Sequence, residues 1–201
     1  GAIMDKMKNA YQRAMERVEQ LGNASEEETI RLTWMPKGQT AAAQYLNGQE
    51  ELQSSIDSCP TEMLPHFLEG ITKVLLQNIT LPKSQDDHRR GELAVKGMSV
   101  TKKDTKALEG ITSKITYILS TYMMYKNEKM NEMYEETKTK FQSRVQETLI
   151  QQGKIAPGTP VPINVEAMPE FRQEWNNVLL QFDDQYSEPL NLQKAKLEKI
   201  S

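Results

Sequence analysis

The stretch from about Thr101 to Gln152 constrains the fold more than any other part of this sequence. It contains no proline, and it ends at Gly153, four residues before Pro157. Apolar side chains recur along it at the three- and four-residue spacing of a helix. These are Leu108, Ile111, Ile115, Leu119, Tyr122, Met123, Met130, Tyr134, Phe141, Val145 and Leu149. The pattern predicts one helix of about fifty residues, which would span about 75 Å.

The apolar residues of this predicted helix also repeat at intervals of eleven. One track is Leu108, Leu119, Met130 and Phe141, and a second is Met123, Tyr134 and Val145. An eleven-residue repeat favours straight or slightly right-handed packing, although a plain amphipathic helix explains the same spacing. Both interpretations require a partner surface along most of the helix.

Residues 3 to 21 predict a first helix with a narrow apolar seam. Its apolar positions alternate three and four apart, as in a coiled coil: Met4, Met7, Tyr11, Ala14, Val18 and Leu21. Because the seam covers fewer than three heptads, we expect this helix to lie against the long one. Gly22-Asn23 should end it.

A capping box, Ser25 to Glu28, predicts the start of a second helix. This helix should run to Leu46 and stop at Asn47-Gly48, with a kink or a break at Pro36. Three shorter helices should follow it. They are Gln49 to Ser58, the strongly apolar Pro60 to Ile79, and Ser84 to Met98.

The segment Gly153 to Pro169 contains four prolines and predicts an extended connector. Val161, Ile163 and Val165 alternate within it and could form a short extended strip. The last helix should begin near Pro169 and kink near Pro189. Its aromatic stripe, which includes Phe171, Trp175, Phe182 and Tyr186, predicts antiparallel packing on the long helix.

The expected fold is therefore all-α, an elongated helical bundle organised around a spine at about residues 101–152. Residues 1–201 should form a single domain. Its compact helical part should occupy residues 25–100. Residues 101–201 should form a long helical hairpin, with the proline-rich connector at residues 153–169.

Charge and composition exclude several classes of partner. The formal net charge is −3 and the isoelectric point about 5.6, so the basic surface of a nucleic-acid-binding protein is not expected. No apolar run is long enough to cross a bilayer, and the first residues do not resemble a signal peptide. Cys59 is the only cysteine, which suits a reducing compartment. We expect a cytoplasmic protein with no membrane partner.

The sequence offers little for catalysis or metal binding. Its two histidines are His66 and His88, and neither belongs to the paired Glu-x-x-His motifs of a dimetal bundle. Cys59, at a probable helix start, could have a lowered thiol pKa, but no neighbouring motif supplies a base. Phosphate-binding loops and zinc-ligand sets are also missing. We expect no catalytic residue, no metal and no cofactor, and therefore no enzyme.

What remains is a candidate interaction surface on the long helix. It consists of Met123, Met130, Met133, Tyr134 and Phe141. Flexible thioethers beside aromatic rings adapt to apolar partners, and a protruding patch of this kind would mark an interaction site. Alternatively, another helix of the chain covers these residues and they belong to the core.

Two functions follow from the surface interpretation. The first is a non-enzymatic interaction or scaffold protein that binds a protein partner or a second copy of itself. The alternative is a holdase-like chaperone that binds apolar segments through its Met/Tyr-rich helix surface.

Overall fold

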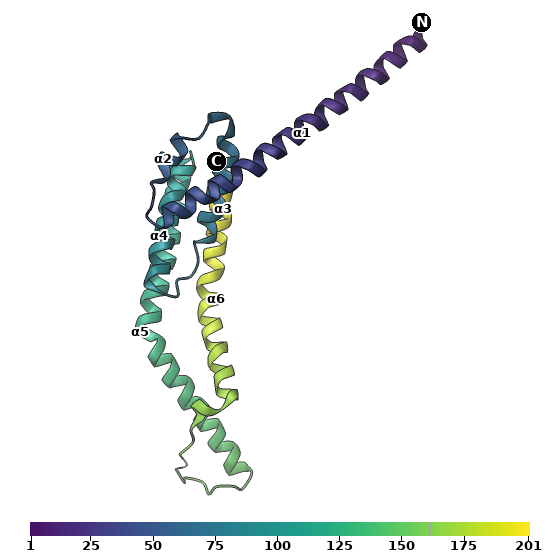
Figure 1. Ribbon diagram of the computed structural model, residues 1–201. Coiled ribbons are helices and arrows are strands. Elements are labelled where there is room, and N and C mark those ends of the chain that lie inside the picture. Colours follow the sequence, from purple (N-terminus) through teal and green to yellow (C-terminus); the bar gives the residue numbers. More distant parts are fainter. Residues whose placement is uncertain (161) are drawn as a thin grey trace. The chain divides into compact units, whose positions relative to one another are not determined.

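The computed structural model describes residues 1–160 and 162–201, so Val161 of the predicted strip lies outside the described residues. Every regular element in the described residues is helical (Figure 1), which confirms the predicted all-α fold. The helices are α1 (Ala2–Leu46), α2 (Leu52–Asp57), the 3₁₀ helix η1 (Thr61–Met63), α3 (Leu64–Gln77), α4 (Gln85–Thr101), α5 (Thr105–Gln151), the 3₁₀ helix η2 (Val165–Ala167) and α6 (Pro169–Lys199).

The chain divides into two compact units. Residues 1–79, 92–105 and 201 form the first unit, and residues 80–91 and 106–200 form the second. The first unit contains α1, α2, α3 and the later part of α4. The second contains α6 and nearly all of α5. Each unit is described separately below.

The predicted break between the first two helices is wrong, because α1 continues through Gly22 and Ser25. Gly22 is not among the glycines with a positive φ, and one glycine in a helical conformation costs only about 1 kcal/mol. The carbonyl of Ser25 accepts the Thr29 hydroxyl at 2.8 Å, so Ser25 lies within a helical turn. Pro36 also lies inside α1 without splitting it.

The predicted end of this helix at Asn47-Gly48 is confirmed. Gly48 has a φ of 74°, the left-handed conformation that glycine adopts without steric cost. Its N–H donates to the Tyr45 carbonyl at 3.0 Å, and the Gln49 N–H donates to the Gln44 carbonyl at 2.9 Å. These two bonds form a Schellman motif, which satisfies the last carbonyls of α1.

Two glycines let α1 and α3 cross in backbone contact. A Cβ atom on Gly38 would lie 2.0 Å from the Phe67 carbonyl oxygen, and one on Gly70 would lie 2.0 Å from the Met35 carbonyl oxygen. Both positions therefore require glycine. Around this crossing the first unit buries apolar side chains from several helices, including Ala42, Leu46, Leu52, Ile71, Leu75 and Met98.

In the second unit, α5 corresponds to the predicted spine but begins at Thr105, after a break at residues 102–104. It ends as expected at Gly153, which has a φ of 70°. The Lys154 N–H donates to the Leu149 carbonyl at 3.0 Å and closes the end of α5.

The predicted antiparallel packing of α6 on the spine is confirmed. The ring of Tyr122 contacts Phe182, whereas Tyr134, further along α5, contacts the earlier Trp175. Pro169 is the first residue of α6, and the helix continues through Pro189 to Lys199. The expected extended strip is wrong at Val165, because this residue is fully buried within η2.

Candidate interaction surfaces

The first half of α1 carries the most exposed apolar surface in the described residues. Its heptad seam is formed by Met4, Met7, Tyr11, Ala14, Val18 and Leu21. The five larger side chains keep between 62% and 73% of their surface exposed. Figure 1 shows this half of α1 extending away from the rest of its unit. Within its own unit, packing on α1 begins only near Ile30. The expectation that this helix lies against the long one, which belongs to the other unit, stays a prediction.

The surface predicted on the long helix is partly covered by the same chain. Met123, Met130, Met133, Tyr134 and Phe141 are all half-buried. Ring centroids of Tyr134 and Trp175 lie 5.1 Å apart, and those of Phe141 and Phe171 lie 5.6 Å apart. Edge-to-face packing at these distances is typical of an aromatic core. Tyr134 and Phe141 therefore fit the alternative in which α6 covers them.

More exposed apolar side chains on α5 lie outside the five residues of the predicted surface. Tyr117 keeps 71% of its surface exposed and Met124 keeps 47%. They are seven residues apart and so share one face of the helix. Their seven-residue spacing is visible in the sequence, but spacing alone does not show which face of α5 packs against α6.

A part-buried polar contact joins α5 and α6 near the middle of the hairpin. The Tyr122 hydroxyl donates to Asp183 Oδ1 at 2.7 Å, and it accepts a hydrogen bond from Lys126 Nζ at 3.3 Å. Burial, together with the bond to the Asp183 carboxylate, raises the pKa of Tyr122 well above its usual value. The hydroxyl therefore remains a donor across the whole physiological range, and the contact is structural.

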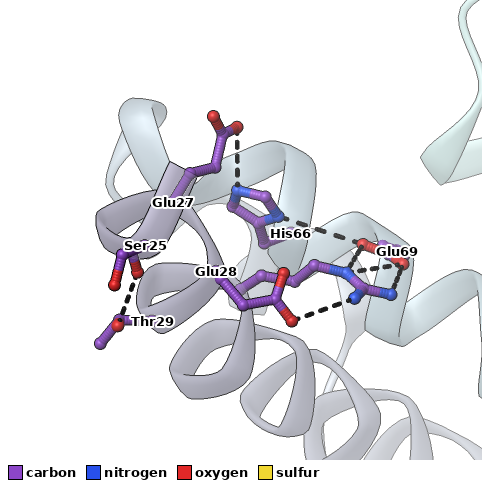
Figure 2. Close-up of polar contacts among 7 residues, drawn as sticks. Ser25, Glu27, Glu28, Thr29, His66 and Glu69 are labelled. Atoms are coloured by element: carbon purple, nitrogen blue, oxygen red, sulfur yellow. Dashed lines mark hydrogen bonds and ion pairs between the residues drawn. The ribbon is translucent and has the colours of Figure 1, made fainter. Parts of the chain in front are cut away.

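A polar network marks the point where α1 begins to pack on α3 (Figure 2). Arg31 donates to both oxygens of Glu69, with an Nη2–Oε1 distance of 2.8 Å. His66 lies 4.0 Å from Glu69 and 3.8 Å from Glu27. The hydrogen bond from Arg31 lowers the pKa of Glu69, and its effect is to keep this carboxylate ionised at neutral pH.

The same network explains His66 without a metal. Its two ring nitrogens face carboxylates from α1 and α3, and the guanidinium of Arg31 occupies the space beside Glu69. Within the part of the chain that the structure describes, no group of three or more His, Cys, Asp or Glu side chains is arranged to hold a metal ion.

Cys59 lines an open pocket of about 460 Å³ in the first unit, together with Trp34, Lys37 and Phe67. Burial raises the pKa of the Cys59 thiol, and the charge of Lys37 offsets this only in part. The hypothesis of a lowered thiol pKa is therefore wrong. The residues that line this pocket include no histidine that could act as a base.

The acidic residues at the start of α4 cap this helix. The Asp87 N–H donates to Ser84 Oγ at 3.1 Å, and the Lys83 N–H donates to Asp87 Oδ2 at 3.0 Å. Asp86 forms a salt bridge of 2.8 Å with Arg89, and the hydrogen bond from Arg89 lowers the pKa of Asp86. These contacts stabilise the first turn of the helix.

Comparison with known proteins places the chain in a family but not in a functional class. A family of unknown function, DUF6657, matches residues 53–199. This match covers most of the chain, and the protein therefore belongs to that family. No curated protein and no solved structure matches it. The heptad seam lies before the matched residues. Among the described residues, no helix combines the length and the apolar character needed to span a membrane.

Proposed function

We propose that this protein is a non-enzymatic helical interaction or scaffold protein of the cytoplasm. The observation that supports this proposal is the exposed heptad seam of α1. Its side chains are apolar and regularly spaced, yet they remain solvent-exposed on a helix that is anchored by its second half. Exposed apolar surface that is contiguous in this way marks interaction sites.

The anchoring of α1 suits this role. The Gly38–Gly70 crossing and the Arg31–Glu69 ion pair hold the second half of the helix on α3. The first half continues the same helix and carries the seam away from the packed part of its unit. A partner would therefore meet a preformed helical face, which reduces the conformational entropy lost on binding.

The proposal can be tested by protein capture with three forms of the full chain. Val18→Glu places a charge in the seam, whereas Asn9→Glu adds the same charge on the opposite face of α1. We expect a protein, either another copy or a different one, to be retained in stoichiometric amounts by the wild type and by Asn9→Glu and to be lost with Val18→Glu. If no protein distinguishes these variants, the seam is not an interaction surface and the proposal is wrong.

The alternative function is a holdase-like chaperone. The observation that favours it is the exposure of Tyr117 and Met124 on one face of α5. We expect such a chaperone to suppress the aggregation of a heat-denatured client protein, and Met124→Glu to weaken the suppression. If the wild type does not suppress aggregation, or if Val18→Glu abolishes the effect while Met124→Glu does not, this face of α5 is not a client-binding surface.

A further inference from the structure

The first half of α1 is a helix without packing partners in the described chain. All of its residues with described side chains up to Thr29 are exposed. Most of the stability of a protein helix comes from packing of its apolar face, and the apolar face of this half of α1 is exposed. A partner that covers the seam would supply the missing contacts.

We infer that a second copy of this chain is that partner, and that two α1 helices pair through their heptad seams as a parallel two-stranded coiled coil. This inference rests on the proposed function, because it assigns a partner to the same surface. Pairing of identical surfaces about a two-fold axis is the commonest route to a soluble oligomer.

The identity of the seam residues favours a coiled coil of two helices. In heptad notation Met4, Tyr11 and Val18 occupy the a positions, and Met7, Ala14 and Leu21 occupy the d positions. A β-branched residue at a with leucine at d favours parallel dimers, and Val18 with Leu21 follows this rule. The next a and d positions are Ser25 and Glu28, so the apolar contact should end after Leu21.

The charges beside the seam permit the parallel orientation. The flanking e and g positions carry only two charged residues, one lysine and Arg17. The other charged residues of this half of α1, at positions b, c and f, point away from a partner. A parallel pair places each g residue beside an e residue of the second copy, so that Arg17 lies beside Gly22 and like charges do not meet.

The first experiment measures the mass of the full chain by light scattering, from low to high micromolar concentration. We expect the mass to rise from 23.0 kDa towards twice that value. Val18→Glu should weaken the dimer by at least about tenfold, because it places charge at a buried a position. The matched variant Asn9→Glu, at the outward f position, should dimerise as the wild type does. Circular dichroism confirms that the folded units are retained.

The second experiment determines the orientation. In a parallel dimer each d position faces the same residue of the second copy. Leu21→Cys in a Cys59→Ser background should therefore form a disulfide between the two copies on mild oxidation, seen as a species of doubled mass in non-reducing gel electrophoresis. In an antiparallel dimer position 21 would lie beside Met4 of the second copy, and this variant should not crosslink.

Each outcome decides between the possibilities. A dimer that resists Val18→Glu, or one that Leu21→Cys does not crosslink, overturns the inference. A wild type that remains monomeric at high micromolar concentration also overturns it. If that monomer still captures a different protein through the seam, the proposed interaction function stands and only the identity of the partner is wrong. If it captures nothing, both proposals fail.

Discussion

The α5–α6 hairpin and the first half of α1 carry the same kind of sequence pattern and have opposite environments. Each has apolar side chains at helical spacing. In the hairpin, α6 supplies Phe171, Trp175 and Phe182 to cover α5. In the first half of α1, the described residues of the same unit leave the apolar side chains exposed. The comparison shows that an apolar stripe requires a partner, but its sequence does not specify whether that partner belongs to the same chain.

The variant with the largest expected effect lies in the α5–α6 hairpin, where α6 covers the apolar stripe of α5. Phe171 keeps 2% of its surface exposed and contacts both Tyr134 and Phe141. Phe171→Ala should destabilise the protein by about 3–5 kcal/mol, through lost burial and the cavity left behind. Trp175→Ala should cost less, because Trp175 is only half-buried. Chemical denaturation measures both effects.

The matched control is Val18→Ala in the uncovered seam. Measured at a concentration where the chain is monomeric, it should change the free energy of unfolding by less than about 0.5 kcal/mol. If Val18→Ala destabilised the monomer as strongly as Phe171→Ala, the seam would be covered in solution by the same chain. The contrast between the two regions would then be wrong.

The next prediction compares the stability changes caused by matched glycine substitutions in the anchored half and the uncovered half of α1. A Cβ atom on Gly38 would clash with the backbone of α3, so Gly38→Ala should destabilise by about 3 kcal/mol, the upper end of overpacking costs. Gly22 lies in the same helix with nothing within 4 Å of its added Cβ. Gly22→Ala should therefore increase helicity and stabilise by up to about 1 kcal/mol. Thermal denaturation, monitored by circular dichroism, measures both changes. Equal effects would contradict the conclusion that only the second half of α1 is packed against α3.

Two pairs of similar motifs show how far the sequence could predict this fold. Gly22 and Gly48 both resemble helix ends, but only Gly48 adopts a positive φ. Ser25–Glu28 and Ser84–Asp87 both resemble capping boxes, yet only the second forms the capping hydrogen bonds. Before Ser84 the chain passes through Leu81-Pro82, whereas Gly22 alone interrupts the sequence before Ser25. A single glycine costs a helix only about 1 kcal/mol, and α1 continues through Gly22.

The sequence predicted where the apolar stripes of the candidate surfaces lie, but not which stripe is buried and which is exposed. The heptad seam was found from spacing alone, and the antiparallel packing of α5 and α6 from the proline-rich connector and the aromatic stripe. Which stripe stays exposed depends on the close crossing at Gly38 and Gly70, which directs the second half of α1 onto α3. Two glycines far apart in sequence give no local sign that they face each other. Spacing likewise gave no indication that Thr137 is buried on α5, where its hydroxyl donates to the Met133 carbonyl at 2.7 Å.

A smaller effect tests the polar contact inside the hairpin. Tyr122→Phe keeps the buried ring and removes the hydrogen bond to Asp183. Because this bond has a charged acceptor, its loss should destabilise by about 1–2 kcal/mol. Tyr117→Phe, on an exposed ring of the same helix, should have no measurable effect. Equal effects for the two variants would show that the Tyr122 hydroxyl is solvated rather than held by α6.

The smallest effect concerns the ion pair where the covered half of α1 begins. The hydrogen bond from Arg31 lowers the pKa of Glu69 below its usual value of 4.5. In acid the unfolded chain therefore binds the proton more readily than the folded one, so this contribution to stability is present at neutral pH and is lost as pH falls below about 4.5. Since both side chains are partly exposed, Glu69→Gln should cost less than about 1 kcal/mol at neutral pH. The difference from the wild type should shrink between pH 5 and pH 3, as measured by thermal denaturation across that range.

The control for this prediction is Glu132→Gln, which removes one negative charge from an exposed carboxylate of α5. A difference that stays constant with pH would mean that Glu69 contributes through packing, and that the ion pair does not help to hold α1 on α3.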